Sequence, residues 1–588
     1  MAAATGTSPA VMDPQAECWL AQIPLEILIR ITYFVSTPDL GSMRLSCKAL
    51  EQRLFNFFSH EFFRKKQFMA STDSLQALID ISNHPTLSPF LKHVIIATDR
   101  PSRPAWSQDR NDPPRALFEV ATADHTHLLA SGGLRDMLAE AFACLSNLET
   151  VDIRDFNAES RTRDGQRAQW RSYGVVTLGN STRSMPDLGP RIDHDPYLDE
   201  LFMAVTAALA AAQARPKSLE VLVRNKKASI FGLHDTAFYI PRRLEPAMAP
   251  LLNGLRSLHL TLALSHPAKM RPFMFQKFLT LTPNLTWLRL NFVRTDPASI
   301  HDVLSWLAFK DGAAPLASID SPPITLCHLE RIDLGDAVLT GKALLSLVSK
   351  FASSLTSLYL HRVCLTGSDD GGGTAGATKV NAWVPCLSAM ARIPGLGLRA
   401  VNFNQLQHST GGWQRYFVSF KVAEGAPLAA SWNCSTSVLT LDKALAQASA
   451  AMVAIWPPEP DPNAMDGTFE RRDACCLMVS VANGVLQRTT RMRTRKRKRR
   501  TRTRTRKRTR MNENWGELER TNLAARCFRL VAVLGVGTLY RRMASFDTQF
   551  TIPRRYHVFT SLCSTTPTGQ GICQRSRRPR RNRASPTI

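Results

Sequence analysis

Leu255-Arg-Ser-Leu258-His-Leu260 is one copy of a phrase, Leu-x-x-Leu-x-Leu, that recurs through the middle of this 588-residue chain. A short strand with this phrase points its leucines into a shared interior, while the residues between them face the other way and can vary. Other copies, some with Ile, Val or Phe for Leu, begin at Leu148, Leu285, Leu329, Leu355 and Leu398, and Leu219 with Leu222 is a degraded copy. The phrase therefore predicts a series of short strands that bury one face.

The segments between these copies are typical of helices, and Gly341 to Phe351 is the clearest of them. Strands that alternate with helices resemble a leucine-rich-repeat solenoid. That resemblance implies an α/β region whose stacked strands form a concave surface suited to a protein target. From Leu219 to Leu398 the copies lie 36, 30, 44, 26 and 43 residues apart, mostly more than the roughly 20 to 29 of regular repeats. We therefore expect a divergent array with long inserts over residues 69–486; the alternative is an irregular α/β domain without a true repeat.

Two stretches have the composition of inserted loops: the Asp/Gly-rich run from Ser368 to Ala375 and the Pro/Arg-rich run from Asp99 to Pro114. Aromatic residues gather beyond them. They are Trp413, Tyr416, Phe417, Phe420, Trp432 and Trp456. Core or capping packing is the favoured role for these rings, and a target-binding platform is the alternative.

A second pattern, IPLEILIRITYFVSTPDLGSMRLSCKAL, covers residues 23–50 and contains two helix starts. Pro24 suits the opening turn of a helix, because its φ is already right and its missing N–H had no partner to lose. Thr37-Pro38-Asp39 is a second helix start of the same kind. It has a hydroxyl available to cap the helix and a carboxylate near the positive end of the helix dipole. The connection between the two helices is short enough to make them neighbours.

The first of these helices is apolar nearly all round. Leu25 and Leu28 mark one face, whereas Ile27, Ile31 and Phe34 lie on another. A helix this short with two apolar faces needs cover on both sides. Its own domain would supply one side and a partner protein the other.

Residues 23–50 resemble the F-box. The pattern of that family runs Leu-Pro, then Glu-Ile or Glu-Leu, a few apolar residues, a proline turn before Asp-Leu, and a phrase ending in Val-Cys-Lys. The order and spacing agree with it. Ile23 replaces the usual Leu, Ser46 the common Val, and Leu50 the Trp of many members. With these changes the segment as a whole remains apolar.

The resemblance implies a small three-helix module over residues 18–68 that docks on a Skp-type adaptor, which joins a cullin-type (SCF) ubiquitin ligase. It also implies that the chain catalyses nothing itself and recruits a protein target. The adaptor-binding residues would be Ile23, Pro24, Leu25, Leu28, Ile31, Leu40, Leu45 and Cys47. Adaptor binding is then expected to fail when Leu28 or Leu45 becomes Asp. The alternative is an apolar helical hairpin in the core of a larger domain.

Charge is distributed very unevenly along the chain, whose net charge is +26. From Gln487 to the end there are 28 basic and four acidic residues, which leaves 46 basic and 44 acidic residues before it. The body is thus nearly neutral, and its composition does not indicate a nucleic-acid-binding fold. We expect residues 487–588 to be a basic, largely disordered tail and residues 1–17 to be disordered as well.

The tail contains a dense basic cluster: Arg495, Lys496, Arg497, Lys498, Arg499 and Arg500. Such a cluster is typical of a nuclear-import signal or a phosphate-binding strip. Without interleaved aromatic residues it would bind nucleic acid only by charge, without reading sequence. An alternative function is therefore a nuclear, nucleic-acid-associated protein that acts through this tail. Another alternative is that the Arg-Thr run is a translated intron.

The sequence lacks the motifs of several common catalytic and binding sites. Gly335 to Gly341 followed by Lys342 has the wrong spacing for a phosphate loop, and there is no Gly-x-Ser-x-Gly elbow and no Cys-x-x-Cys pair. We therefore expect no catalytic, cofactor-binding or metal-binding residues. No secretory signal and no membrane span is evident, so the expected location is the nucleus, the cytoplasm or both, with no membrane partner.

Overall fold

The computed structural model describes residues 19–101, 113–157, 162–164, 171–182, 196–224, 232–264, 273–293, 295–309, 324–366, 381–409, 415–435 and 440–454. All of these residues belong to the first of two compact units, Met1–Ala464. The expected disordered start (1–17), the loop Ser368 to Ala375 and the basic tail with its cluster Arg495 to Arg500 lie outside the described residues.

The first described residues form a bundle of helices, α1 (Trp19–Gln22), α2 (Leu25–Thr32), α3 (Thr37–Ser46) and α4 (Lys48–Phe63). Helix α2 begins directly after Pro24, as that proline predicts. Helix α3 also begins where expected, but its cap differs. The hydroxyl of Ser36 accepts the hydrogen bond from the backbone N–H of Asp39 at 3.3 Å, and the Thr37 hydroxyl bonds elsewhere.

These helices share a small core of their own, which we call the module core: Leu28, Leu40, Leu50, Leu54, Phe58 and Phe62. Four of its members recur every fourth residue along α4, so they form one stripe of that helix. Helix α4 ends at Phe63, and residues 65–69 form the first strand rather than more helix. They do so because pairing with the next strand satisfies their backbone and buries Phe68 in the sheet core.

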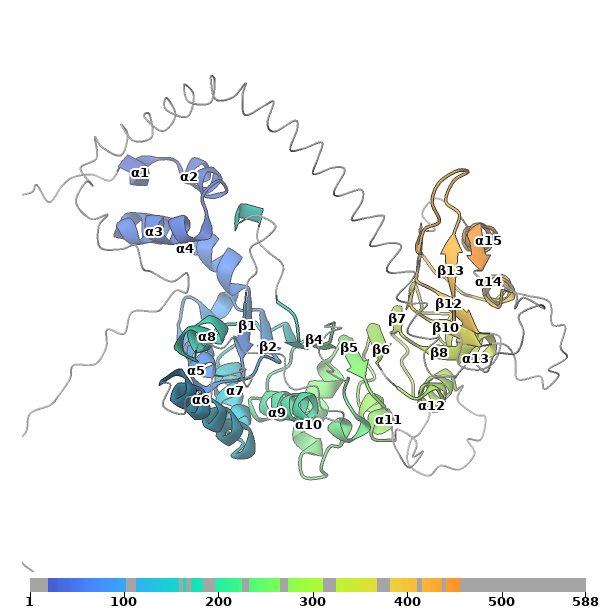
Figure 1. Cartoon of the computed structure of the whole chain (residues 1–588), viewed down its shortest axis with the longest axis horizontal. Coiled ribbons are helices and arrows are strands. Elements are labelled where there is room, and N and C mark those ends of the chain that lie inside the picture. The colour runs from blue at the N-terminus through green and yellow to red at the C-terminus, as the bar shows by residue number, and fades with distance from the viewer. Residues whose placement is uncertain are drawn as a thin grey trace, which may run out of the picture. The chain divides into compact units, whose positions relative to one another are not determined.

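The rest of the described chain is mixed α/β around a large, mostly parallel sheet (Figure 1). Its strands lie in the order in which they occur in the chain, all parallel except the last. They are β1 (Lys65–Met69), β2 (His93–Ala97), β3 (Thr150–Arg154), β4 (Ser218–Leu222), β5 (Ser257–Leu262), β6 (Trp287–Phe292), β7 (Arg331–Gly335), β9 (Ser357–His361), β11 (Ala400–Asn404) and the antiparallel β14 (Ser431–Ser435).

The leucine phrases coincide with strands β3, β5, β6, β7, β9 and β11, and the degraded copy at Leu219 coincides with β4. The strand register aligns their apolar residues into rows that face one side of the sheet. One row consists of Val151, Leu219, Leu258, Leu288, Ile332, Leu358 and Val401, none more than 2% exposed. The residues between them must therefore point to the opposite face.

Helices connect the strands and cover the apolar face, as α9, α10 and α11 do beside β4, β5 and β6 in Figure 1. They are α5 (Thr72–Asn83), α6 (Pro113–Ala130), α7 (Gly133–Ala143), α8 (Val175–Thr182), α9 (Tyr197–Ala211), α10 (Glu245–Gly254), α11 (Phe273–Thr280), α12 (Pro297–Ala308), α13 (Gly341–Lys350), α14 (Trp383–Ala391) and α15 (Leu441–Ala451), with short 3₁₀ turns at Ser88–Phe90, Thr162–Asp164 and Asp235–Phe238. Helix α13 matches the helix expected after Gly341.

A corner recurs at the end of β7, β9 and β11. Asp336, Arg362 and Gln405 follow these strands and have φ of 51°, 54° and 51°, a left-handed conformation uncommon outside glycine. After each corner comes a short strand of a second sheet: β8 (Val338–Thr340), β10 (Cys364–Thr366) and β12 (Gln407–Ser409), which pair in parallel. The same strand, corner and strand thus repeat three times.

The aromatic segment closes the C-terminal end of both sheets. Strand β13 (Tyr416–Phe420) pairs with β12 and with β15 (Met452–Ala454), and β14 covers the edge of β11. Phe420 is fully buried, and its ring lies 5.7 Å from that of Trp432. The packing role favoured for these aromatic residues thus holds for Phe420 and Trp432, whereas Phe417 is 47% exposed and Trp413 and Trp456 lie outside the described residues.

Candidate functional site

The helices α1 to α3 expose an unusual number of large apolar side chains. Six of the seventeen exposed large apolar residues in the described chain lie between residues 19 and 45. We call these six the apolar helix surface: Trp19 (65% exposed), Leu25 (38%), Ile27 (48%), Tyr33 (59%), Phe34 (91%) and Leu45 (77%). An excess of exposed large apolar side chains in one small module is typical of protein contact sites.

The predicted adaptor-binding residues divide into three groups. Leu28 and Leu40 are fully buried in the module core, so they cannot touch a partner. Ile23, Ile31 and Cys47 are half-buried, and Pro24, Leu25 and Leu45 are exposed.

Two exposed residues, Trp19 and Tyr33, were missed by the sequence pattern because both lie outside the predicted helix faces. The sequence predicts Ile27 and Phe34 on a second apolar face of the first helix, outside the adaptor-binding set; Ile27 lies on α2, but Phe34 lies in the turn after it. Their exposure is the signal that would have included them.

A shallow depression lies beside the apolar helix surface. Ile29, Tyr33, Phe57, His60 and Glu61 line it, and it has a volume of about 400 Å3. The rings of Tyr33 and Phe57 meet edge to face with their centres 5.6 Å apart, which fixes one wall. The depression thus combines an apolar wall with the polar side chains of His60 and Glu61.

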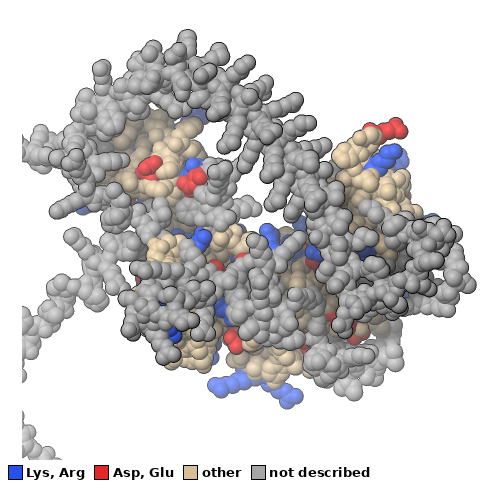
Figure 2. Space-filling view, in the orientation of Figure 1, with Lys and Arg blue, Asp and Glu red and all other residues tan. Residues whose placement is uncertain are grey.

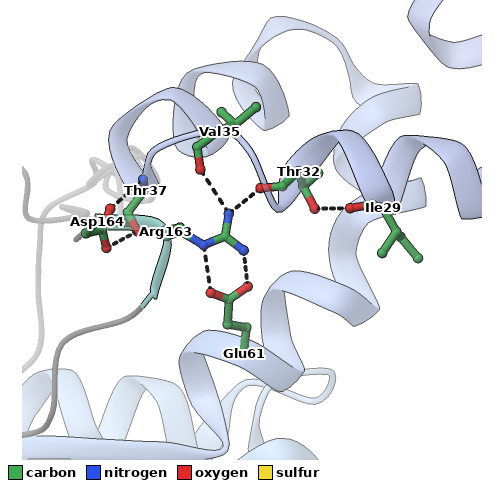
Figure 3. A network of polar contacts seen from close by, with 7 residues as sticks. All are labelled: Ile29, Thr32, Val35, Thr37, Glu61, Arg163 and Asp164. Atoms are coloured by element: carbon green, nitrogen blue, oxygen red, sulfur yellow. Dashed lines mark hydrogen bonds and ion pairs between the residues drawn. The ribbon is translucent and has the colours of Figure 1, made fainter. Parts of the chain in front are cut away.

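Arg163, from the turn Thr162–Asp164, enters the helical bundle (Figure 3). Its guanidinium donates two parallel hydrogen bonds to the Glu61 carboxylate, at 2.9 and 2.5 Å. It also donates to the backbone carbonyl oxygens of Thr32 and Val35, at 2.7 and 3.3 Å. The side chain is only 4% exposed, so these charge-assisted bonds are well shielded from water.

Asp164, the residue after Arg163, binds the start of α3. Its carboxylate accepts hydrogen bonds from the backbone N–H of Thr37 at 2.9 Å and from the Thr37 hydroxyl at 2.7 Å. A carboxylate is favourable at this end of α3, because the helix dipole is positive there. We call Arg163 and Asp164 together the clamp.

The clamp touches the end of α2, the start of α3 and the last turns of α4 at once. It is supplied by a segment more than 90 residues further along the chain. Fixing three helices from outside reduces the freedom of their relative positions, so the apolar helix surface is held in one arrangement.

The second candidate site is the sheet face opposite the helices. The register aligns one row of polar side chains across it, which we call the polar sheet face: Asp152, Glu220, His259, Arg289, Asp333 and Tyr359. Six neighbouring strands each contribute one residue. The lateral spacing of parallel strands, ~4.8 Å, places these groups within reach of one another.

Most of these groups are already paired. Arg154 donates to the buried Asp152, and Glu220 Oε1 lies 3.5 Å from His259 Nδ1. Burial together with the nearby Lys65 and Arg154 lowers the pKa of His93, which faces Asp152, to about 3. Burial alone would raise the pKa of Glu220, but His259, His93 and the Ser218 hydroxyl together outweigh it and lower the pKa to about 2.

Comparison with known proteins adds no assignment: no protein-family model matches the chain, and no curated protein matches it either. Among the described residues there is no group of three His, Cys, Asp or Glu side chains placed to hold a metal ion. None of the helices that the structure describes has the length and apolarity required to cross a membrane. In the view of Figure 2, positive and negative side chains of the described residues are interspersed.

Proposed function

We propose that the chain is a target-recruiting subunit of a cullin-type ubiquitin ligase. In this proposal helices α1 to α4 are an F-box that binds a Skp-type adaptor, and the strand array is a divergent leucine-rich-repeat region that holds a protein target. The chain itself is not an enzyme. It brings a target to the ubiquitin-transfer machinery by binding both.

The apolar helix surface is the observation that carries the proposal. A bundle of about 45 residues that exposes Phe34 at 91% and Leu45 at 77% leaves apolar area in water, and each such side chain would gain about 1.5 to 3 kcal/mol on burial. A helical adaptor partner would provide that burial. The order of sequence features from Ile23 to Leu50 supports the same assignment independently.

The repeat assignment is supported by the strand order and by the corners. Strands that follow chain order in one parallel sheet, with helices on one face only, are typical of solenoid proteins. The left-handed residues Asp336, Arg362 and Gln405 mark equivalent positions in three successive units. In this proposal the target contacts the face of the sheet opposite the helices.

The test is co-purification of the full chain with a Skp-type adaptor. The full chain is required, because the clamp residues are absent from a fragment of the first 70 residues. Leu45→Asp is the informative variant, since Leu45 is exposed and its replacement leaves the module core intact. Gln52→Asp, which adds the same charge at an exposed polar position of α4, is the matched control.

We expect the wild type and Gln52→Asp to retain the adaptor and Leu45→Asp to lose it. Circular dichroism of each variant establishes that the helices remain folded. A folded wild-type chain that retains no adaptor would overturn the proposal. Equal retention by Leu45→Asp would mean that the apolar helix surface is not the contact.

A further inference from the structure

Arg289 is the exceptional residue of the polar sheet face. It lies on β6, in register with His259 on one side and Asp333 on the other. It is half-buried, yet its side chain makes no hydrogen bond or ion pair with any residue that the structure describes. Burial lowers its pKa. The positive charges of Arg224 and Arg331 also lower this pKa, whereas the carboxylates of Asp333 and Glu220 raise it.

The nearest carboxylate is engaged by another arginine. Arg331 donates to both oxygens of Asp333, from Nε at 2.8 Å and from Nη2 at 2.9 Å. Its guanidinium also stacks between the rings of Trp287 and Tyr359, 3.9 Å from each ring centre. A planar cation between two aromatic faces has little freedom, so Asp333 is held by Arg331 and is not available to Arg289.

A second cation lies nearby without a neutralising carboxylate. Arg224 is exposed, and its guanidinium lies 4.3 Å from the centre of the Phe156 ring. Its backbone N–H donates to Asp155, but no ion pair to its side chain occurs among the described residues. Arg224 is close enough to Arg289 to affect its pKa, so the two form a small positive region on a sheet face that is otherwise charge-balanced.

The indole of Trp287 adds a neutral donor beside this region. Its Nε1 is buried and has no acceptor among the residues that the structure describes. A buried donor without a partner costs free energy, so an acceptor supplied by a ligand would be favoured there. The positive region therefore combines charge with an unused donor, on an indole whose ring already contacts Arg331 and His259.

We propose that Arg289 binds the carboxylate of an acidic side chain in an extended segment of the target protein, with Arg224 and Trp287 as flanking contacts. This inference rests on the proposed function, since it takes the sheet as the target-binding region. A carboxylate fits the planar fork of a guanidinium. A doubly charged phosphate is disfavoured, because the Glu220 and Asp333 carboxylates lie close to Arg289.

The experiment measures binding of a fluorescent, photoreactive peptide of alternating glutamate and glycine to the full chain. Arg289→Gln removes the charge and keeps a polar side chain. Arg392→Gln removes the same charge from an exposed position at the end of α14 and is the control. We expect Arg289→Gln to weaken peptide binding by at least about tenfold, the loss of one charge-assisted pair, and Arg392→Gln to leave it within about twofold.

Mass spectrometry of the photoproducts separates this site from the basic tail. Crosslinks to strands β4 to β9 that disappear in Arg289→Gln support the inference. Crosslinks confined to residues 487–510, or unchanged affinity in Arg289→Gln, overturn it. A phosphoserine peptide that binds more tightly than the glutamate peptide through Arg289 would also overturn the choice of carboxylate.

Failure of this inference is distinguishable from failure of the proposed function. Adaptor binding involves α1 to α3, so Arg289→Gln should retain the adaptor fully. If the wild type binds no adaptor but still binds the acidic peptide through Arg289, the proposed function fails and the peptide site stands. If the adaptor binds and the peptide does not, only the peptide site fails.

Discussion

The helical module and the sheet body carry opposite kinds of side chain away from their apolar cores. The apolar helix surface consists of six large apolar side chains with no pairing requirement, around a core without ionisable groups. The polar sheet face consists of ionisable groups held in register, nearly all of them paired. Apolar area gives binding strength with little dependence on orientation, whereas paired charges give selectivity at a cost in desolvation. Under the proposed function, the helices would bind one constant partner and the sheet a selected one.

The largest effect should come from a charge placed in the module core. Leu28→Asp buries a carboxylate among Leu40, Leu54 and Phe58, which is expected to cost more than about 4 kcal/mol and to unfold α1 to α4. The sheet body should remain folded, since its core forms a separate cluster. Hydrogen exchange would show residues 19–63 unprotected and β3 to β9 unchanged. Simultaneous loss of protection in both regions would contradict two separate cores.

A smaller loss is expected when the clamp is broken. Glu61→Ala removes the carboxylate that receives two hydrogen bonds from the nearly buried Arg163, and should destabilise the module by about 2 kcal/mol. Glu51→Ala is the control, because Glu51 is exposed and lies 3.8 Å from Arg44; such pairs contribute less than about 1 kcal/mol. Equal losses of protection in the two variants would show that the clamp is not what holds the helices.

On the polar sheet face a substitution should stabilise the chain. Arg289→Met replaces a half-buried, unpaired cation with an apolar side chain of similar length, which is expected to raise the free energy of unfolding by about 1 kcal/mol. Leu45→Gln on the apolar helix surface should change it by less than about 0.5 kcal/mol. Chemical denaturation monitored by hydrogen exchange measures both, in the sheet strands for Arg289→Met and in α2 to α4 for Leu45→Gln. A destabilised Arg289→Met would mean that the arginine has a structural partner.

The smallest effect concerns pH. The hydrogen bond from His234 Nδ1 to Asp199 at 2.8 Å raises the pKa of His234 above its usual value of about 6.5, against a smaller effect of burial. The resulting stability is fully present below pH ~6.5 and is lost as pH rises through the folded pKa, and it should be under about 1 kcal/mol.

Comparing the wild type with Asp199→Asn checks this dependence. Hydrogen exchange of α9 should show a larger stability difference between the two proteins at acidic than at alkaline pH. Exchange of α4 should show no difference, because the module core has no ionisable residue. A difference that grows with rising pH would contradict the assigned direction.

Much of the sheet could be predicted from sequence, because the leucine phrase is local. Each copy from Leu148 to Leu398 falls on a strand, since alternate apolar residues report directly on burial. Strands β1 and β2 were missed, because Phe68 and Ile96 fill equivalent positions without the phrase. The corners were missed as well, since Asp336, Arg362 and Gln405 adopt a left-handed conformation through their tertiary setting rather than through glycine.

The candidate sites were less predictable. The sequence placed both Leu28 of α2 and Leu45 of α3 in the adaptor-binding set, although Leu28 is buried and Leu45 is exposed. Periodicity identifies apolar positions but does not show which neighbour covers them. The clamp was invisible in sequence, since Arg163 and Glu61 are brought together only by the fold. Arg289 likewise became notable only when the register showed that its neighbouring carboxylate is taken by Arg331.

The most direct test of two surfaces with separate partners is the adaptor affinity of three full-length proteins measured side by side: the wild type, Leu45→Asp and Arg289→Gln. We predict that Leu45→Asp weakens adaptor binding by at least about a hundredfold, corresponding to loss of roughly 3 kcal/mol of buried apolar contact, and that Arg289→Gln binds as the wild type does. Equal affinity of all three, or loss of adaptor binding by Arg289→Gln alone, would contradict the account.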